Sequence, residues 1–133
     1  MKKQVLILAA LIALPLLAGC SGRGAYNPTF DPQERSKVIM IDRSMVRSFK
    51  VVSEITPTRL DGGELEAGIV IENATGKDIR ADYKFVFVDK DGGELDSTAW
   101  TPKLFIRGTR ETLKSNSLNP EAADYRVYIR PQQ

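Results

Sequence analysis

The sequence predicts an all-β fold, an antiparallel immunoglobulin-like β-sandwich of about seven strands, preceded by a signal peptide and a flexible tether. Apolar and polar residues alternate with a period of two from Lys37 onward, as they do in half-buried strands. Turn residues recur at intervals of about ten positions, and no long amphipathic helix is evident. A small barrel is the second choice for this pattern. The 133 residues suffice for one domain, which we place at residues 37–133.

Residues 1–19 have the pattern of a lipoprotein signal peptide. A basic start, Met1-Lys2-Lys3, precedes an apolar segment over residues 5–17, and the segment ends in Leu17-Ala18-Gly19-Cys20. The apolar segment is too short for a transmembrane helix. Its last four residues resemble the lipobox of bacterial lipoproteins, whose cysteine takes a diacylglyceryl group and becomes the first residue of the mature chain. We therefore predict that Cys20 is acylated and anchors the protein to a lipid bilayer.

Residues 20–36 are predicted to be the lipidated N-terminus and tether. The segment from Ser21 to Glu34 is rich in Gly, Pro and small polar residues, which is the composition of a linker. At ~3.3 Å per residue it reaches at most roughly 45 Å, which holds the domain close to its leaflet. Ser21 stands where an aspartate is the usual signal for inner-membrane retention in enteric-type bacteria. The expected location is therefore the outer membrane, with the domain facing the periplasm.

Composition narrows the class of function. The chain has 19 Lys and Arg against 17 Asp and Glu, and removal of Lys2 and Lys3 with the signal peptide makes the two signs equal. A nucleic-acid partner is not expected, because no run of basic residues remains. With one cysteine, the domain has no internal disulfide. Histidine and an S-x-x-K pair are both absent, so we expect no enzyme, no cofactor and no metal site.

Seven segments have strand patterns: Val38–Ile41, Phe49–Ile55, Glu64–Asn73, Ile79–Val88, Leu104–Ile106, Thr112–Leu118 and Tyr125–Arg130. The first is a short apolar run, and the second is rich in residues that favour strands. In the third, four apolar residues alternate with glutamates and a glycine, which predicts one buried and one wet face. In the fourth, an inward row ending in Phe85 and Phe87 leaves Val86 and Val88 on the outer face. One helical turn is expected at Pro120–Ala123, before the last strand.

The pentapeptide DGGEL occurs twice, at Asp61–Leu65 and at Asp91–Leu95. Asp-Gly and Gly-Gly supply the positive φ angles that tight hairpin turns require. The flanking sequences differ, which argues against a domain duplication, and the glutamate comes too early for the distal ligand of a calcium loop. We predict two hairpin turns that bind no metal. The N-A-T motif after the third strand is likewise predicted to be a turn, with Asn73 and Gly76 in left-handed geometry.

Six residues are candidates for a binding surface: Val86, Val88, Trp100, Phe105, Arg126 and Tyr128. An outward patch of valines and a tyrosine rimmed by arginines has the composition of a protein contact. Two alternatives remain open: the tether or the strand at Lys37–Asp42 covers the patch, and Trp100 is a core or edge plug. An accessible apolar patch favours a protein partner. A cleft lined by Trp100 and polar groups favours a small ligand.

Four segments carry a family resemblance: VIENAT at Val70–Thr75, YKFVFVDKDG at Tyr83–Gly92, Trp100, and YRVYIR at Tyr125–Arg130. Together they resemble the YcfL family of small bacterial lipoproteins, with Phe87 where an indole is common. The resemblance implies an immunoglobulin-like sandwich on the periplasmic face of an outer membrane. That family has no established activity. Some members are encoded near lipoprotein activators of peptidoglycan synthases, which implies a link to cell-wall assembly.

The sequence therefore predicts a membrane-anchored periplasmic lipoprotein whose domain binds or links envelope components without catalysis. The expected partners are the lipid bilayer, through acylated Cys20, and an envelope protein. The alternative is a β-sandwich module that binds a glycan or a lipid.

Overall fold

The computed structural model describes residues 36–133. The predicted signal peptide, the predicted lipidation site Cys20 and all but the last residue of the predicted tether lie outside the described residues, so these assignments stay predictions. Within residues 36–133, no helix is long and apolar enough to cross a bilayer.

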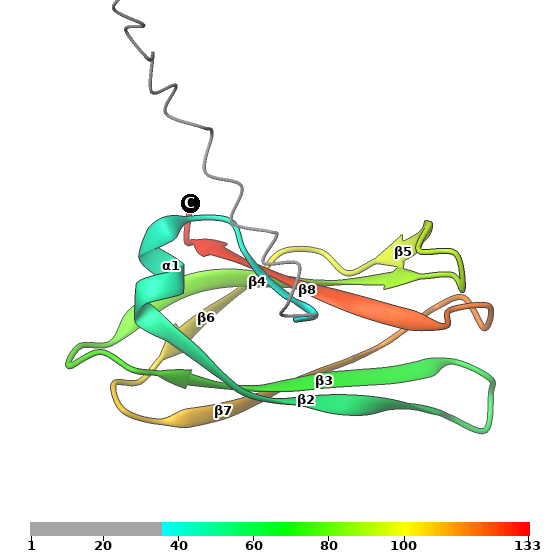
Figure 1. Ribbon diagram of the computed structural model, residues 1–133, viewed down its shortest axis with the longest axis horizontal. Coiled ribbons are helices and arrows are strands. Elements are labelled where there is room, and N and C mark those ends of the chain that lie inside the picture. Colours follow the sequence, from blue (N-terminus) through cyan, green and yellow to red (C-terminus); the bar gives the residue numbers. More distant parts are fainter. Residues whose placement is uncertain (1–35) are drawn as a thin grey trace, which may run out of the picture.

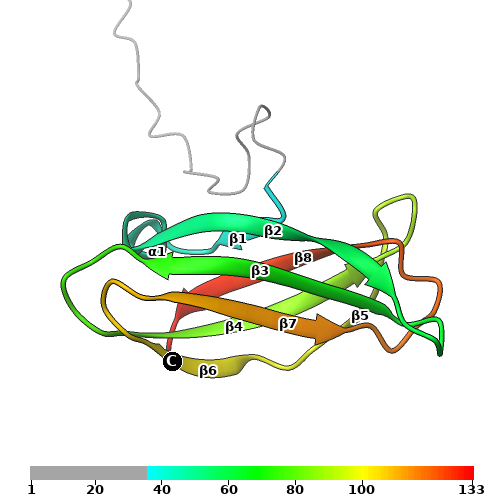
Figure 2. The ribbon, with the colours of Figure 1, turned by 90° about the horizontal axis from the view of Figure 1, so that it is seen from below.

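Two β-sheets pack face to face, and one short helix lies at an end of the sandwich (Figures 1 and 2). The elements follow in chain order: β1 (Val38–Met40), α1 (Arg43–Ser48), β2 (Phe49–Arg59), β3 (Leu65–Asn73), β4 (Ile79–Val88), β5 (Glu94–Ser97), β6 (Thr101–Phe105), β7 (Arg110–Asn116) and β8 (Asp124–Pro131). The predicted sandwich is confirmed. β5 is not among the seven predicted strand segments, although a hairpin turn was predicted just before it.

The two sheets have different sizes. β8 and β4 form the centre of a five-stranded sheet in the order β1-β8-β4-β5, with β6 also paired to β4. β2, β3 and β7 form a three-stranded sheet with β3 in the middle. β1 pairs with β8 in parallel, and the other pairs are antiparallel. Along the chain, β2, β3 and β7 take the places of immunoglobulin strands A, B and E, and β4, β5 and β8 those of C, C′ and F.

Alternate side chains of the central strands fill the space between the sheets. The inward row predicted for β3 is confirmed by the burial of its apolar residues Leu65, Ala67, Ile69 and Ile71. On β4, Phe85 and Phe87 face the core as predicted, with ring centroids 6.3 Å apart. This arrangement decides which residues of β4 point outward.

Both DGGEL segments form hairpin turns, as predicted, but in different registers. In the β2–β3 turn, the N–H of Gly63 donates to the Leu60 carbonyl at 2.9 Å, and Gly63 has a φ of 93°. In the β4–β5 turn, the N–H of Gly92 donates to the Asp89 carbonyl at 3.1 Å, and Gly92 has a φ of 86°. The left-handed residue is therefore the second glycine of one copy and the first glycine of the other. The shift follows from Asp89, whose carboxylate accepts from two of the following N–H groups and starts its turn earlier.

The turn between β3 and β4 begins at Asn73, as predicted, but without left-handed geometry. Among the described residues only three glycines have a positive φ, so the conformation expected for Asn73 and Gly76 is wrong. The Asn73 side chain closes the turn instead. Its Nδ2 donates to the Lys77 carbonyl at 2.9 Å, and its Oδ1 accepts from the Thr75 N–H at 3.0 Å.

The helix α1 joins β1 to β2 and has its own capping residue. The carboxylate of Asp42 accepts from the N–H of Ser44 at 2.7 Å and also from the Ser44 hydroxyl. These two hydrogen bonds lower the pKa of Asp42, the hydroxyl contributing most. Met45 is buried and fixes the helix to the sandwich. The helical turn predicted at Pro120–Ala123 is a simple turn without helical structure.

Candidate functional site

Alternate residues of β4 and β8 point away from the core and form the outer face of the five-stranded sheet, the upper layer in Figure 1. The antiparallel register places Asp82 opposite Arg130 and Lys84 opposite Tyr128. Because Phe85 faces the core, the neighbouring Lys84 and its partner Tyr128 face outward. The register therefore brings together polar and aromatic side chains that are far apart in the sequence.

Trp100, just before β6, completes a cation–aromatic cluster with Lys84, Tyr128 and Arg130. The guanidinium carbon of Arg130 lies 4.0 Å from the centroid of the Trp100 ring. The Nζ of Lys84 lies 5.1 Å from the Trp100 centroid and 5.6 Å from the Tyr128 centroid. Contacts of this kind contribute about 0.5–1 kcal/mol each at exposed sites. Two cations thus hold two rings in a fixed arrangement on the outer face.

The cation–aromatic cluster carries an excess of positive charge. The Nε of Arg130 donates to the Oδ2 of Asp82 at 3.3 Å, and Asp82 is only 6% exposed. Lys84 and the nearby Arg80 form no ion pair with any residue in the described part of the chain. On the opposite sheet, both cations of β7 have carboxylate partners: Arg110 with Glu72, and Lys114 with Glu66. The outer face of the five-stranded sheet is thus the better placed of the two to meet an anionic partner.

Val86 and Val88 point outward, as their alternation predicts, but they are not accessible. Val86 is 4% exposed and Val88 is 5% exposed. Of the two covers considered, the Lys37–Asp42 strand is wrong, because β1 extends the sheet beside β8, and the tether lies outside the described residues. Polar neighbours on β5 and β8 flank the valines instead: Ser97 and Arg126 beside Val86, and Glu94 and Asp124 beside Val88. The two valines are therefore wrong as binding residues.

Phe105 is also wrong as a binding residue. It is 1% exposed, and its ring meets Phe49 edge to face with centroids 4.8 Å apart. Its neighbours Leu104 and Ile106 are the exposed members of this apolar run. The apolar patch that would have favoured a protein partner is therefore absent at these positions.

Trp100, Arg126 and Tyr128 are the candidates that the structure places on or beside the outer face. The arginine rim predicted for this surface consisted of Arg126 and Arg130, so the sequence indicated Arg130 but missed Lys84. The signal for Lys84 was the period of two itself, which puts it in phase with Val86.

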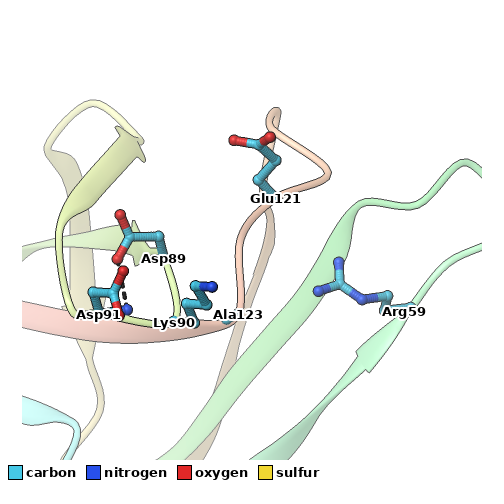
Figure 3. Close-up of a pocket in the computed structure, with 6 residues that line it drawn as sticks. All are labelled: Arg59, Asp89, Lys90, Asp91, Glu121 and Ala123. Atoms are coloured by element: carbon cyan, nitrogen blue, oxygen red, sulfur yellow. Dashed lines mark hydrogen bonds between the residues drawn. The ribbon is translucent and has the colours of Figure 1, made fainter.

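A shallow pocket of about 500 Å³ lies at the opposite end of the sandwich from α1, and Figure 3 shows the residues that line it: Arg59, Asp89, Lys90, Asp91, Glu121 and Ala123. Two of its charged side chains, Arg59 and Asp89, hydrogen-bond to the backbone of local turns. The Arg59 guanidinium donates to the carbonyls of Gly63, Pro120 and Ala122 at 3.0, 2.8 and 2.7 Å. In residues 36–133 no group of three acidic, cysteine or histidine side chains is arranged to hold a metal ion.

Replacing Asp89 and Asp91 together by Asn is expected to change the free energy of unfolding by less than about 0.5 kcal/mol. An amide oxygen at position 89 can still accept the two turn hydrogen bonds. Added calcium is expected to raise the Tm of neither form, as measured by thermal melts with and without the ion. A calcium-dependent rise in the parent that the double variant lacks would contradict the turn assignment.

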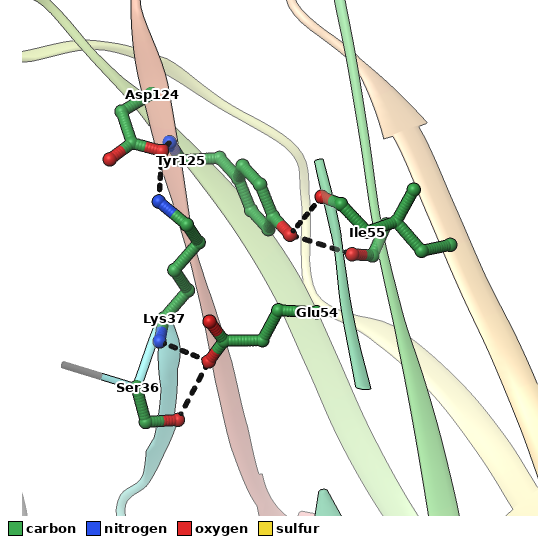
Figure 4. A network of polar contacts seen from close by, with 7 residues as sticks. Ser36, Lys37, Glu54, Ile55, Asp124 and Tyr125 are labelled. Carbon is green, nitrogen blue, oxygen red and sulfur yellow. Dashed lines mark hydrogen bonds and ion pairs between the residues drawn. The ribbon is translucent and has the colours of Figure 1, made fainter. Parts of the chain in front are cut away.

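A polar network links the two sheets at the edge where β1 lies near β2 (Figure 4). One carboxylate oxygen of Glu54 accepts from the Lys37 N–H at 2.6 Å and from the Ser36 hydroxyl at 3.0 Å. The Lys37 ammonium forms an ion pair with Asp124. The Tyr125 hydroxyl lies 2.6 Å from the Gly68 carbonyl and 2.9 Å from the Ile55 carbonyl, and donates its proton between them.

Burial raises the pKa of Tyr125 to about 12, with smaller contributions from the negative charges of Glu54 and Asp124. The hydrogen bond to the Gly68 carbonyl acts in the opposite direction. Tyr125 is therefore a neutral donor at physiological pH, and its role in this network is to join the sheets.

The fold places the chain among β-sandwich domains of the immunoglobulin type. The chain belongs to the family described as "Protein of unknown function (DUF1425)", whose model matches residues 37–131. None of the curated proteins compared with the chain matches it.

Two solved structures resemble the chain. A DUF1425 family member from Shewanella sp. is 24% identical, with a TM-score of 0.56, and the match covers 64% of this chain and 79% of that one. The Campylobacter jejuni protein cj0090 is 20% identical, with a TM-score of 0.53, and the match covers 72% of this chain and 98% of that one. At these identities the similarity establishes a shared fold.

Proposed function

We propose that this protein is a membrane-anchored periplasmic lipoprotein whose β-sandwich is a non-enzymatic binding domain for another component of the cell envelope. The observation that carries the proposal is the cation–aromatic cluster of Lys84, Trp100, Tyr128 and Arg130, because it is preorganised and lies on an open sheet face. Cations without a carboxylate partner, such as Lys84 and the nearby Arg80, favour an anionic partner, and the two rings hold Lys84 in place.

The cluster favours a glycan or lipid ligand over an apolar protein contact. The apolar residues required for a protein contact, Val86, Val88 and Phe105, are buried. Trp100 is surrounded by polar side chains, which is the arrangement expected for ligand recognition. A protein that presents acidic groups remains the second candidate, since Arg126 and Tyr128 are residue types enriched at protein interfaces.

The proposed location and context rest on the sequence. Cys20 ends a lipobox-like motif, and Ser21 does not match the inner-membrane retention signal, which supports an outer-membrane anchor with the domain in the periplasm. The resemblance to the YcfL lipoproteins supports a role near peptidoglycan assembly. The absence of histidine from the chain supports a binding role without catalysis.

Replacing Cys20 by Ser is expected to leave an uncut precursor without acyl chains, because the thiol is the acceptor of the lipid. Intact-mass spectrometry and membrane fractionation measure both changes. Cys20 is the only cysteine in the chain, so no other thiol can substitute. A processed and acylated serine variant would remove the basis for the anchor.

In-cell photo-crosslinking tests the binding face. A photoreactive residue at position 128, on the outer face of the five-stranded sheet, is expected to give adducts with an envelope component. The matched control is position 112, which is exposed on the opposite sheet. Adducts that form equally at both positions, or at neither, would argue against the outer face as the binding surface.

A further inference from the structure

The outer face of the five-stranded sheet is an ordered apolar and cationic surface. The register aligns Ile39 of β1 with Tyr128 of β8, and Tyr128 with Lys84 of β4, next to Trp100. One row further along, Arg130 and Asp82 lie beside Pro102. The next row contributes Arg80 and Leu104. Four strands thus present aromatic, aliphatic and basic side chains on one face of the sheet, with Asp82 as the acidic residue of these rows.

The end of this surface nearest α1 is more apolar than the rest. Leu104 is 40% exposed on β6, and Ile41, directly after β1, is 46% exposed. Arg80 is exposed on β4, which lies between β6 on one side and β8 and β1 on the other. Exposed aliphatic side chains next to unpaired cations are the composition of surfaces that lie on a bilayer, where the apolar groups enter the interface and the cations meet phosphates.

The way the chain enters the domain keeps this surface within reach of the proposed membrane anchor. Residues 21–35 separate the predicted anchor from Ser36, and they span at most roughly 50 Å. Ser36 leads directly into β1, which is an edge strand of the five-stranded sheet. The backbone N–H of Lys37 is held by Glu54, and its ammonium by Asp124, so the entry point is fixed to both sheets.

We propose that the outer face of the five-stranded sheet docks on the anionic phospholipid headgroups of the leaflet that carries the anchor. Lys84 and Arg80 would meet the headgroup phosphates, and Trp100 and Tyr128 would lie at headgroup depth, where amphipathic rings are enriched. The inference rests on the proposed function for the anchor, which keeps the domain close to the bilayer. The attraction between the basic outer face and anionic headgroups, in contrast, depends only on the domain and not on the anchor.

Trp100 is the only tryptophan in the chain, so its fluorescence reports directly on this surface. The full lipidated protein is reconstituted into phosphatidylcholine vesicles with or without phosphatidylglycerol, each made with brominated or ordinary acyl chains. The measured quantity is the ratio of Trp100 intensity between ordinary and brominated lipid, in which intrinsic changes of the fluorophore cancel. Quenching is expected to be about twofold stronger in the anionic vesicles and to weaken with added salt.

Charge-reversal variants distinguish docking of this face from quenching that arises only because the anchor holds the domain near the bilayer. Arg80→Glu with Lys84→Glu is expected to reduce the quenching in anionic vesicles to its level in neutral ones. The matched control, Arg110→Glu with Lys114→Glu, makes the same charge change on exposed positions of the opposite sheet and is expected to retain the quenching. Both double variants are first checked for a parent-like circular dichroism spectrum and Tm. Equal quenching in neutral and anionic vesicles, or an equal loss in the two double variants, would overturn the proposal.

Two further measurements distinguish this inference from the proposed function. Intact mass of the protein purified from cells reports whether the anchor exists. The mature chain, residues 20–133, prepared without acyl groups, reports in the same quenching assay whether the face binds anionic vesicles by itself. An acylated protein whose Trp100 is not quenched keeps the anchor and overturns the docking. Photo-crosslinks from position 128 that contain protein or glycan instead of phospholipid also overturn it.

Discussion

Asn73→Ala is expected to lower the free energy of unfolding by about 3 kcal/mol, since several partly or fully buried groups lose their hydrogen bonds at once. Asn73 is 1% exposed. Its Nδ2 donates to the carbonyls of Lys77 and Phe105, and its Oδ1 accepts from both the N–H and the hydroxyl of Thr75. The side chain therefore ties the β3–β4 turn to the end of β6. Urea denaturation at neutral pH measures the change.

Two variants control for this prediction. Asn116→Ala removes an amide from an exposed position of β7 and should change stability by less than about 0.5 kcal/mol. Asn73→Asp keeps the two acceptor bonds from Thr75 but removes both donors, so its effect should be large as well. A loss under about 1 kcal/mol for Asn73→Ala would mean that water replaces the amide, and the link between the turn and β6 would have to be abandoned.

The strands that the sequence predicts well are those with one clear period. In β3, apolar residues alternate with glutamates and a glycine except at Val70, and the predicted inward row is confirmed. The two DGGEL turns were also predictable, because glycine at a left-handed position is a local requirement. Their shift in register depends on a side chain outside the repeat, Asp89, and so the repeat alone could not indicate it.

Short and uniformly apolar segments were harder to predict. Leu104, Phe105 and Ile106 are consecutive apolar residues, and a period of two allows either phase. Pairing of Phe105 with Ile79 of β4 decides the phase and buries Phe105. The six-residue helix α1 is too short to develop a helical period, and it was not predicted from the sequence.

At the candidate site, a side chain that points away from the core is not always accessible to solvent. Val86 and Val88 were predicted to point outward, yet they are only 4% and 5% exposed, with residues of β5 and β8 on either side. The cation–aromatic cluster depends on the register between β4 and β8, which brings Lys84 next to Tyr128. Register across a long connection is set by the packing of the whole sheet, so the cluster could not be assembled from the sequence alone.

Tyr125→Phe is expected to lower the free energy of unfolding by about 2 kcal/mol at neutral pH, because two buried carbonyls lose their donor. Tyr125 is 1% exposed, and its hydroxyl serves the carbonyls of Ile55 and Gly68. These carbonyls lie where β2 has an irregular register after Ile55, close to Pro57, which has no N–H to offer. The phenol hydroxyl thus supplies a donor at the irregular part of the β2–β3 pairing.

Ionisation of the Tyr125 hydroxyl makes the stability difference between the parent and Tyr125→Phe depend on pH. Burial raises the pKa of Tyr125 to about 12 in the folded protein, above the ordinary value of about 10 in the unfolded chain. Between these values the unfolded chain binds fewer protons, so the stability contributed by Tyr125 is complete below pH ~10 and falls as the pH rises toward ~12.

The stability difference between the parent and Tyr125→Phe is therefore expected to be constant from neutral pH to about pH 10 and then to shrink by roughly 1 kcal/mol per pH unit. Urea denaturation of both proteins across this range measures it, and the titration of groups common to both proteins cancels in the difference. Tyr128→Phe, at the half-buried outer-face position, should cost less than about 0.5 kcal/mol at neutral pH. A difference between the parent and Tyr125→Phe that stays constant up to pH 12 would show that the phenol ionises as readily in the folded as in the unfolded protein, and the buried link between the sheets would be wrong.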